Sequence, residues 1–375
     1  MTAFTITGRD GAARCGVLRT AHGPVETPTF MPVGTHASVK ACHPAEVRAA
    51  GAQIILANAY HLALRPGVDL IERAGGLQRF MAWDGPILTD SGGYQLISLA
   101  GVAGVDDEGA TFISPWDGSR LRVTPEVAVG IQSRLGADIL MCLDHPVAWG
   151  APPELAREAT ARTHRWAERC RAVSLPPDRL LFGIVQGGFD AGDRRASARH
   201  LGGLGFDGLA IGGLSVGESV ADMEALTRAC AEAMPDVCPR YFMGLGTDRE
   251  LVALAALGVD MFDCVVPTRL ARNGTALTWA GQLRLSNSER REELGPVDPD
   301  CDCLCCRDFS RAYLRHLFSS REMLAHRLLS IHNITHLCRL MERVREAIRA
   351  GRLADLRGEV EEAAGREAAT PDRPG

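Results

Sequence analysis

The chain alternates short apolar runs with longer amphipathic stretches, and this alternation restricts its fold more than any other feature. Eight β-branched or apolar runs predict strands, and they are Thr29–Val33, Gln53–Ala57, Pro86–Thr89, Asp138–Leu143, Leu180–Val185, Gly208–Ile211, Arg240–Met243 and Asp260–Val266. Stretches of helical period lie between most of them, such as Pro44–Ala52, Pro125–Leu135, Pro153–Arg171 and Ser219–Met234. Eight strands alternating with helices over about 250 residues predict an α/β protein with a (β/α)8 barrel. A doubly wound open sheet is the alternative.

Composition excludes several other classes of protein. The 375 residues are 46% hydrophobic and 23% charged, with a net charge of −5, as in ordinary globular proteins. No run approaches the roughly 18 apolar residues of a membrane helix, and the charged N-terminus does not match a signal peptide. We therefore expect a cytoplasmic protein with no membrane partner. The single lysine, Lys40, is not in a Gly-Lys-Ser/Thr sequence, which excludes a phosphate-binding loop.

Polar residues and glycine recur at or near the carboxyl ends of the predicted strands. They are Asn58, Asp90, Asp144, Gln186, Gly213 and Asp263. In a (β/α)8 barrel this end carries the active site. Each residue taken alone could equally cap a strand or form a turn, but the six together predict a site.

Two carboxylate motifs fit glycosyl-transfer chemistry. The first is Thr89–Gln95, Thr-Asp-Ser-Gly-Gly-Tyr-Gln, in which glycines let a ligand approach the backbone next to Asp90. The second is Asp260–Cys264, Asp-Met-Phe-Asp-Cys. Two carboxylates across a pocket can act as nucleophile and general acid, as in retaining glycosyl transfer. Structural caps are the alternative interpretation.

The chain changes character after Asn287. Residues Glu289–Asp302 are acidic and contain proline, and two helical patterns follow, Asp308–Leu329 and Ile334–Arg352. We expect a barrel catalytic domain over 1–290, a zinc-binding helical subdomain over 291–352 packed on it, and a flexible tail over 353–375.

Four of the twelve cysteines crowd into six residues. Cys301, Cys303 and Cys306, together with His332 at the start of the final helix, match a closed tetrahedral structural Zn²⁺ site, one per chain. Cys305 could replace Cys306, and a chance cluster of cysteines is the other interpretation. Because four protein ligands leave no open position for substrate, we expect the zinc to be structural.

Glycine and arginine patterns give weaker indications. The glycines of Gly203–Gly208 precede a predicted strand, so they do not match a dinucleotide-binding loop. Gly187–Gly188 and Gly212–Gly213 follow strands and leave the backbone free to bind a planar ligand. Pro267–Arg291 holds five arginines against one acid, Glu289, and is the best local candidate for RNA-phosphate contacts, although a solvated charged face is commoner.

Taken together, the motifs resemble the bacterial type of the tRNA-guanine transglycosylase family, from about Phe4 to Arg352. The matching stretches are His22–Pro28, Phe30–Gly34, Tyr60–Leu62, Leu64–Gly67, Thr89–Gln95, Gly183–Gly188, Ile211–Glu218 and Asp260–Arg269, with the cysteine–histidine spacing given above. The resemblance implies a pentosyltransferase in queuosine biosynthesis. Its partners would be a tRNA whose anticodon loop carries U-G-U and a 7-deazaguanine base, which replaces the wobble guanine.

The resemblance also implies residue roles. Asp263 would be the nucleophile that attacks the ribose C1′ and forms a covalent intermediate, and Asp90 the general acid/base. The residues that match base-binding positions are Ser91, Asp144, Gln186, Gly213 and Leu214, with Tyr94 and Met243 sandwiching the ring. Arg269 and Arg272 match residues that hold the anticodon loop. A flipped base needs stacking faces and edge partners, so this set is physically coherent.

The family pattern further implies a homodimer, through aromatic contacts at Phe309, Tyr313 and His316. This chain departs from the pattern at Ile331, where a glutamate is common, so an intersubunit salt bridge to Lys40 would be absent. A catalytically silent RNA-binding subunit remains an alternative, although such a subunit would be expected to lose catalytic carboxylates. A zinc hydrolase would need an open metal position.

The incoming base is expected to be 7-aminomethyl-7-deazaguanine. Members that use queuine commonly have glycine where this chain has Val216, whose side chain would obstruct the cyclopentenyl ring. His145-Pro146 stands where Glu-Cys is common and alters one wall of the pocket. Ser215 is shared with members that use queuine, and it favours queuine as the incoming base.

Overall fold

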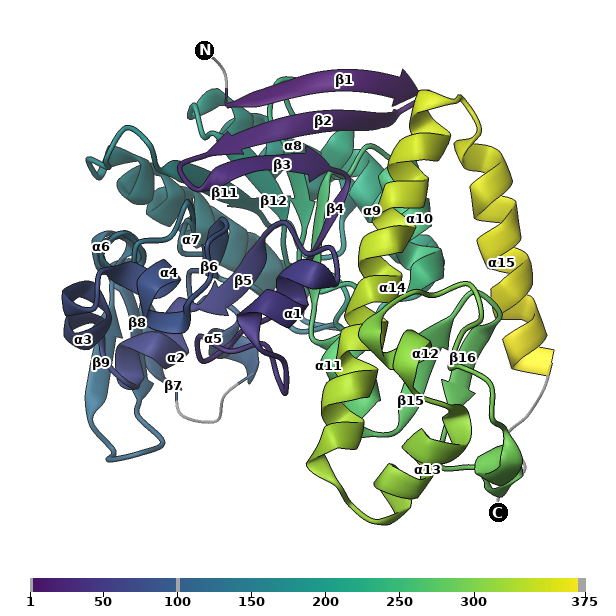
Figure 1. Ribbon diagram of the computed structural model, residues 1–375. Helices are drawn as coiled ribbons and strands as arrows, with labels where there is room; N and C mark the ends of the chain where they lie inside the picture. The colour runs from purple at the N-terminus through teal and green to yellow at the C-terminus, as the bar shows by residue number, and fades with distance from the viewer. Residues whose placement is uncertain (1–2, 99–101, 370–375) are drawn as a thin grey trace.

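The computed structural model describes residues 3–98 and 102–369, and eight parallel strands form its centre (Figure 1). The strands are β4 (Thr29–Pro32), β5 (Ile55–Asn58), β6 (Ile87–Asp90), β10 (Ile139–Met141), β11 (Leu180–Val185), β12 (Gly208–Ile211), β13 (Arg240–Phe242) and β14 (Met261–Cys264). Their order is β4-β14-β13-β12-β11-β10-β6-β5. A parallel bridge between Val33 and Leu56 joins the two end strands and closes the ring. The predicted (β/α)8 barrel is confirmed, and the open sheet is excluded.

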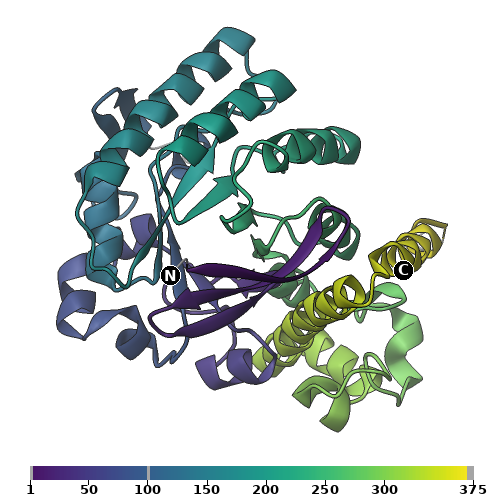
Figure 2. The same cartoon turned by 90° about the horizontal axis from the view of Figure 1, so that it is seen from above.

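Helices surround this barrel (Figure 2). They are α1 (Pro44–Ala49), α2 (Ala59–Leu64), α3 (Val68–Arg73), α4 (Gly76–Met81), α5 (Gln95–Ser98), α6 (Pro125–Leu135), α7 (Pro153–Ala172), α8 (Ala191–Gly203), α9 (Val220–Ala231), α10 (Asp248–Ala256) and α11 (Val266–Arg272). Side-chain oxygens cap several of their N-termini, since Thr124, Asp190, Ser219 and Thr247 each accept a hydrogen bond from the backbone three residues on. The amphipathic stretches therefore fold where the sequence predicted.

A three-stranded antiparallel sheet lies across the amino end of the barrel (Figures 1 and 2). It consists of β1 (Phe4–Asp10), β2 (Ala13–Thr20) and β3 (Gly23–Thr27). A buried ion pair attaches it, because Arg14 Nη2 lies 2.6 Å from Asp260 Oδ2, and Nε donates to Oδ1 at 3.1 Å. Asp260 Oδ2 also accepts the Arg240 N–H at 2.6 Å. Asp260 is thus a structural residue at the end away from the predicted site.

A second antiparallel sheet is inserted after β6. It consists of β7 (Val102–Asp106), β8 (Gly109–Ile113) and β9 (Arg120–Val123). Phe112 of β8 is buried and packs its ring 4.9 Å from that of Tyr60 in α2. This contact attaches the insertion to the carboxyl-end side of the barrel, where α2 begins.

The C-terminal part packs along the side of the barrel (Figure 1). It contains β15 (Thr275–Thr278), β16 (Gly281–Arg284), the 3-10 helix η1 (Ser288–Glu292), α12 (Leu304–Asp308), α13 (Arg311–Ser319), α14 (Met323–Arg349) and α15 (Leu353–Ala369). Helix α14 contacts β4, α11 and β15. Arg345 in its last turns is buried and donates to the Pro28 carbonyl at 2.7 Å.

Two expectations for this part were wrong. The patterns over 308–329 and 334–352 are not two long helices, since α13 is short and α14 runs unbroken from Met323 to Arg349. Residues 353–369 are not a flexible tail but form α15, which buries Leu353, Leu356 and Val360 against the rest of the core. Its many Glu and Ala residues suggested disorder, but the apolar residues three to four positions apart give it one packing face.

Candidate active site and metal centre

Three aspartates gather at the carboxyl end of the barrel. Asp90 is the last residue of β6, Asp144 follows β10, and Asp263 lies within β14. Asp144 and Asp263 are 5% and 8% exposed. Asp90 is close enough for the charges of the other two to raise the pKa of its carboxyl. The structure therefore brings together, at the end where barrel enzymes carry their sites, the three carboxylates that the sequence singled out.

The Asp263 carboxylate is held by one of its two oxygens. The Tyr241 hydroxyl donates to Oδ1 at 2.6 Å, and the Gly244 N–H donates to the same atom at 2.8 Å. Within the described residues, no hydrogen bond engages Oδ2. Burial raises the pKa of Asp263, and the Tyr241 and Gly244 hydrogen bonds act in the opposite direction. The side chain is thus fixed while Oδ2 remains available for chemistry.

Asp90 is held by the start of the neighbouring helix. The Ala59 N–H donates to Oδ1 at 2.9 Å, and the side-chain amide of Asn58 donates to Oδ2. Asn58 also caps α2, accepting the His61 N–H at 3.0 Å. The pKa of Asp90 is raised to about 7, mainly by burial and also by the nearby carboxylates of Asp263 and Asp144, while the two hydrogen bonds act in the opposite direction. A carboxyl with this pKa can both give and take a proton near neutrality.

Asp144 forms a polar edge with its neighbours. Gln186 Nε2 donates to Oδ2 at 2.8 Å, and Ser91 Oγ donates to Oδ1 at 3.4 Å. Burial raises the pKa of Asp144 to about 6. A Cβ at Gly93 would lie 1.9 Å from Asp144 Oδ1, and one at Gly213 would lie 2.3 Å from Gln186 Oε1. Only glycine therefore fits these two positions, and the backbone there approaches the polar edge closely.

The remaining predicted base-binding residues lie on loops at the same end. Tyr94 follows β6 and is 58% exposed, whereas Met243 directly follows β13 and is partly buried. Strands β6 and β13 are four places apart in the closed ring of eight, so these two side chains originate on opposite sides of the mouth. Leu214, next to Gly213, is buried.

The two predicted RNA-binding residues lie on α11, which begins two residues after β14 ends. Arg269 and Arg272 are both exposed. Arg272 Nη1 donates to the Thr268 carbonyl at 2.9 Å, which holds its side chain along the helix. The helix therefore presents two cations beside the strand that carries Asp263.

Sequence reasoning missed Tyr241, which lies in the middle of β13 and is fully buried. A signal was available, because a buried tyrosine normally needs a hydrogen-bond partner for its hydroxyl. Burial is the main cause that raises the pKa of Tyr241 well above its usual value, and the neighbouring Asp263 carboxylate raises it further. Tyr241 thus remains a donor to Asp263 at any physiological pH.

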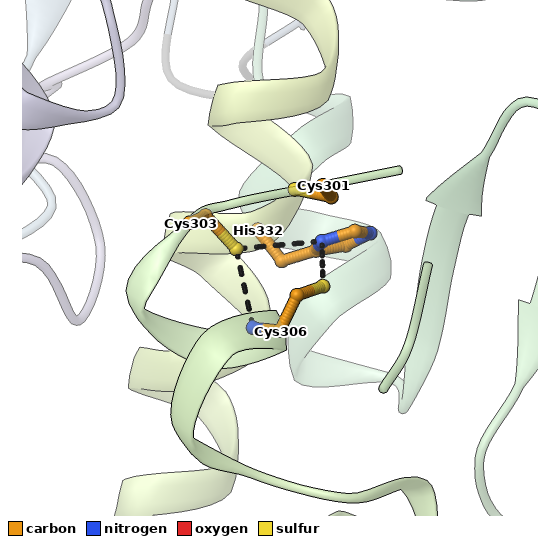
Figure 3. A group of neighbouring side chains, drawn as sticks. All are labelled: Cys301, Cys303, Cys306 and His332. Atoms are coloured by element: carbon orange, nitrogen blue, oxygen red, sulfur yellow. Dashed lines mark hydrogen bonds between the residues drawn. The ribbon is translucent and has the colours of Figure 1, made fainter. Parts of the chain in front are cut away.

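The predicted metal ligands converge on one point (Figure 3). One ligand atom each from Cys301, Cys303, Cys306 and His332 lies within 4.8 Å of the others. His332 Nδ1 is 3.2 Å from Cys306 Sγ and 3.6 Å from Cys303 Sγ. A tetrahedral metal with ligand distances of about 2.0–2.3 Å separates its ligand atoms by about 3.5–3.8 Å, so this set can hold a metal ion.

The imidazole is oriented for this role. His332 Nε2 lies 2.7 Å from the Leu277 carbonyl, which can only accept, so Nε2 carries the proton and Nδ1 faces the thiols. Cys305 does not belong to the cluster, although it is buried nearby. His332 was expected at the start of the final helix but lies well inside α14, which begins at Met323 and is followed by α15.

The residue after His332 connects the metal centre to the barrel. Asn333 is fully buried, and its Oδ1 accepts the Leu277 N–H at 2.9 Å. Its Nδ2 donates to the carbonyls of Pro267 and Thr275, at 3.0 Å each. Pro267 lies in the first turn of α11, so one side chain joins the metal-binding helix to the helix that follows Asp263.

Buried carboxylates with raised pKa values at the carboxyl end of a (β/α)8 barrel are typical of enzymes. The fold and the site therefore define this protein as a (β/α)8-barrel enzyme with additional metal-binding helices. Among the described helices, none is both long and apolar enough to cross a membrane.

Comparison with known proteins gives the family. The model of the family described as Queuine tRNA-ribosyltransferase matches residues 10–366. Proteins with that name from Solidesulfovibrio magneticus and Pelotomaculum thermopropionicum are each 51% identical, over 360 and 356 residues, and the matches cover 96% and 94% of this chain and 96% of each relative. One from Synechococcus elongatus is 50% identical over 339 residues, covering 90% of this chain and 88% of the relative. The chain belongs to the queuine tRNA-ribosyltransferase family, the bacterial tRNA-guanine transglycosylases, which confirms the resemblance.

Proposed function

We propose that this protein exchanges the wobble guanine of U-G-U tRNAs for a 7-deazaguanine, in queuosine biosynthesis, through a covalent intermediate on Asp263. The observation that carries the proposal is the one-sided fixation of this carboxylate. With Tyr241 and Gly244 on Oδ1, Oδ2 is the atom that attacks the ribose C1′. The C1′–N9 bond breaks as the Oδ2–C1′ bond forms, and the bond pair leaves with guanine.

Asp90 supplies and recovers the proton in this scheme. Its protonated carboxyl gives a proton to the departing guanine, and the resulting carboxylate takes one from the incoming base. The new base then attacks C1′ and releases the Asp263 carboxylate. A pKa of about 7 suits Asp90 to both halves of the cycle. Asp263 must be ionised when it attacks. The first half of the exchange therefore requires a charged Asp263 and a protonated, neutral Asp90.

The polar edge around Asp144 is the proposed base-recognition site. Guanine and 7-deazaguanine present N–H donors and a carbonyl acceptor along their edges, and a carboxylate beside an amide can pair with such a pattern. The proposed base-binding residues are Ser91, Asp144, Gln186, Gly213 and Leu214, with Tyr94 and Met243 on the two faces of the ring. The positions of β6 and β13 on opposite sides of the mouth support such a sandwich.

Arg269 and Arg272 are proposed to bind the phosphates of the anticodon loop. Their exposure on α11, directly after the strand of Asp263, supports contact with RNA whose target ribose lies at that aspartate. Arginine suits phosphate because its planar guanidinium can donate two parallel hydrogen bonds. Loss of either residue should therefore weaken tRNA binding without altering the affinity for free guanine.

We propose Zn²⁺ as the ion held by Cys301, Cys303, Cys306 and His332. Three thiolates and one imidazole suit zinc better than harder cations such as Mg²⁺. When bound, it would supply a structural cross-link between the α12 region and α14, since the set is closed to substrate. We also propose the division into a catalytic part over 1–290 and a metal-binding part over 291–352.

A homodimer is proposed through the exposed face of α13. Phe309 and Tyr313 stack with ring centroids 5.4 Å apart, and Tyr313 is 38% exposed. His316 is one turn further along the helix. Phe309 is partly buried, so Tyr313 is the more accessible ring, and surface aromatic side chains are frequent anchors of protein interfaces. Ile331 is buried within the chain, so it offers no surface partner for Lys40 of a second copy.

A base-exchange assay tests the proposed reaction. The purified protein should incorporate radiolabelled guanine into a tRNA with guanine at the wobble position, and a denaturing gel should reveal a covalent protein–RNA adduct. A tRNA with adenine at that position is the negative control. Tight tRNA binding without exchange would instead support a non-catalytic RNA-binding subunit.

The incoming base is proposed to be 7-aminomethyl-7-deazaguanine. Val216 lies in a loop held in place by Glu218, whose carboxylate accepts the N–H groups of Ser215 and Val216. A side chain in a fixed loop cannot easily move aside for a bulky ring, so queuine should be used about tenfold to a hundredfold less efficiently. Equal or better incorporation of queuine would contradict this proposal. Val216→Gly should gain queuine use, whereas Val237→Gly, on a remote exposed turn, should not.

A further inference from the structure

Arg194 is a fully buried arginine of α8 that contacts the loops following β11 and β12. Its guanidinium donates three hydrogen bonds to backbone carbonyls and also contacts the buried Cys230 thiol. Nε donates to Gly188 at 2.8 Å, Nη1 to Gly212 at 3.1 Å and Nη2 to Gly213 at 3.3 Å. No carboxylate forms an ion pair with it in the described part of the chain. A buried cation that is held by neutral groups and has no ion pair is costly to maintain and points to a role beyond packing.

The carbonyls that Arg194 holds belong to two glycine pairs with special backbone conformations. Gly187, Gly188 and Gly213 have φ values of 149°, 55° and 65°. A Cβ at Gly187 would lie 2.7 Å from the backbone nitrogen of Arg194, so the loop packs directly on the helix. Glycine has the largest conformational freedom of any residue. One rigid guanidinium that bridges both pairs therefore fixes segments that would otherwise be free to move.

These two segments carry the polar edge of the candidate active site. Gln186, directly before Gly187, donates to Asp144 Oδ2 at 2.8 Å. The Gly213 Cα is so close to Gln186 that a Cβ there would lie 2.3 Å from Oε1. A shift of either glycine pair by a few tenths of an ångström would consequently move Gln186 or the Gly213 peptide relative to Asp144.

We propose that Arg194 is a positioning residue for base recognition, which locks the Gly187–Gly188 and Gly212–Gly213 loops in the arrangement that receives the planar base. The inference rests on the proposed function and adds a residue that touches neither base nor ribose. Lysine cannot replace this fork, because its single ammonium cannot reach three carbonyls in the same geometry.

The test compares Arg194→Lys, Arg194→Met and Arg194→Ala with a control on the same helix, Arg199→Met, whose side chain is exposed. Misplaced recognition groups should raise the KM for guanine by about tenfold to a hundredfold, with the KM for tRNA changed by less than about twofold. Added guanidinium ion should partly restore the low KM for guanine in Arg194→Ala. Melting temperatures and covalent-adduct yield give the folded, active fraction of each variant.

A purely structural role predicts a different result. If the variants lose only active fraction, with an unchanged KM for guanine and no rescue by guanidinium, the proposal is overturned. Calorimetric titration of guanine on the same proteins separates the inference from the proposed function. Wild type and Arg199→Met without exchange activity would refute the function alone. Weaker guanine binding in the Arg194 variants would still support positioning, and equal binding would overturn it.

Discussion

The barrel mouth and the metal centre both concentrate ionisable side chains, but they treat charge in opposite ways. Asp90, Asp144 and Asp263 are three acids with neutral hydrogen-bond donors and raised pKa values. The cysteines and His332 are arranged so that one divalent cation would compensate them all. Uncompensated buried charge costs stability and is reactive, whereas compensated charge holds segments together. The three aspartates should therefore control chemistry at the expense of stability. The metal centre should stabilise the fold and take no part in the chemistry.

Asp263→Asn should produce the largest change. An amide is a far poorer nucleophile than a carboxylate, so exchange should fall by on the order of 10⁴-fold and the covalent adduct should disappear. Stability should be unchanged or higher, since a buried carboxylate with a raised pKa is removed. Gel trapping and thermal melts measure the two effects. Asp178→Asn, at an exposed position at the other end of the barrel, is the matched control. A surviving adduct would transfer the nucleophilic role to Asp90 or Asp144.

Cys303→Ser should act mainly on stability. Zinc binding is coupled to folding, so loss of one thiolate should lower the free energy of unfolding by about 3 kcal/mol or more. Metal analysis should find one zinc per chain in the wild type and little in the variant, while the fraction that stays folded keeps its exchange rate per active site. Cys305→Ser, two residues away and outside the cluster, should retain zinc. A zinc content near zero in fully active wild-type protein would contradict the stabilising role proposed for the metal centre.

Asp90→Asn should change stability less than Cys303→Ser does, and in the opposite direction. A pKa of about 7 in the folded state exceeds the value of about 3.9 in an unfolded chain. The folded state therefore binds the proton more tightly, and this contribution to stability is complete below pH 4 and lost as the pH rises through 7. At pH 8 the variant should be more stable than wild type by about 1–3 kcal/mol, with the difference vanishing towards pH 4.

The same carboxyl should shape the pH dependence of exchange. Wild-type kcat/KM should fall above about pH 7, where Asp90 loses its proton, and should fall in acid as Asp263 becomes protonated. Asp90→Asn should be nearly inactive but still bind tRNA. Chemical denaturation and exchange rates across the pH range test both statements, and an alkaline limb that persists in the residual activity of the variant would assign it to another group.

The sequence by itself determined the features that are local in the chain. Periodicity placed the eight strands and most helices, because side chains alternate with period 2 in strands and 3.6 in helices wherever one face is buried. The position of Asp90 at a strand end and the close spacing of Cys301, Cys303 and Cys306 could also be read directly from the sequence. Each depends on residues only a few positions apart.

The tertiary structure alone decided which of these residues share a site. Asp260 and Asp263 lie three residues apart, yet one pairs with Arg14 at the amino end of the barrel and the other bonds Tyr241 at the carboxyl end. The role of residues 353–369 was likewise hidden, because their few apolar side chains find a surface only after the core has formed. Which residues share a site depends on the order of the strands and on the closure of the barrel, both of which join segments far apart in the chain. These long-range contacts leave no trace in local composition or in the periodicity of apolar residues.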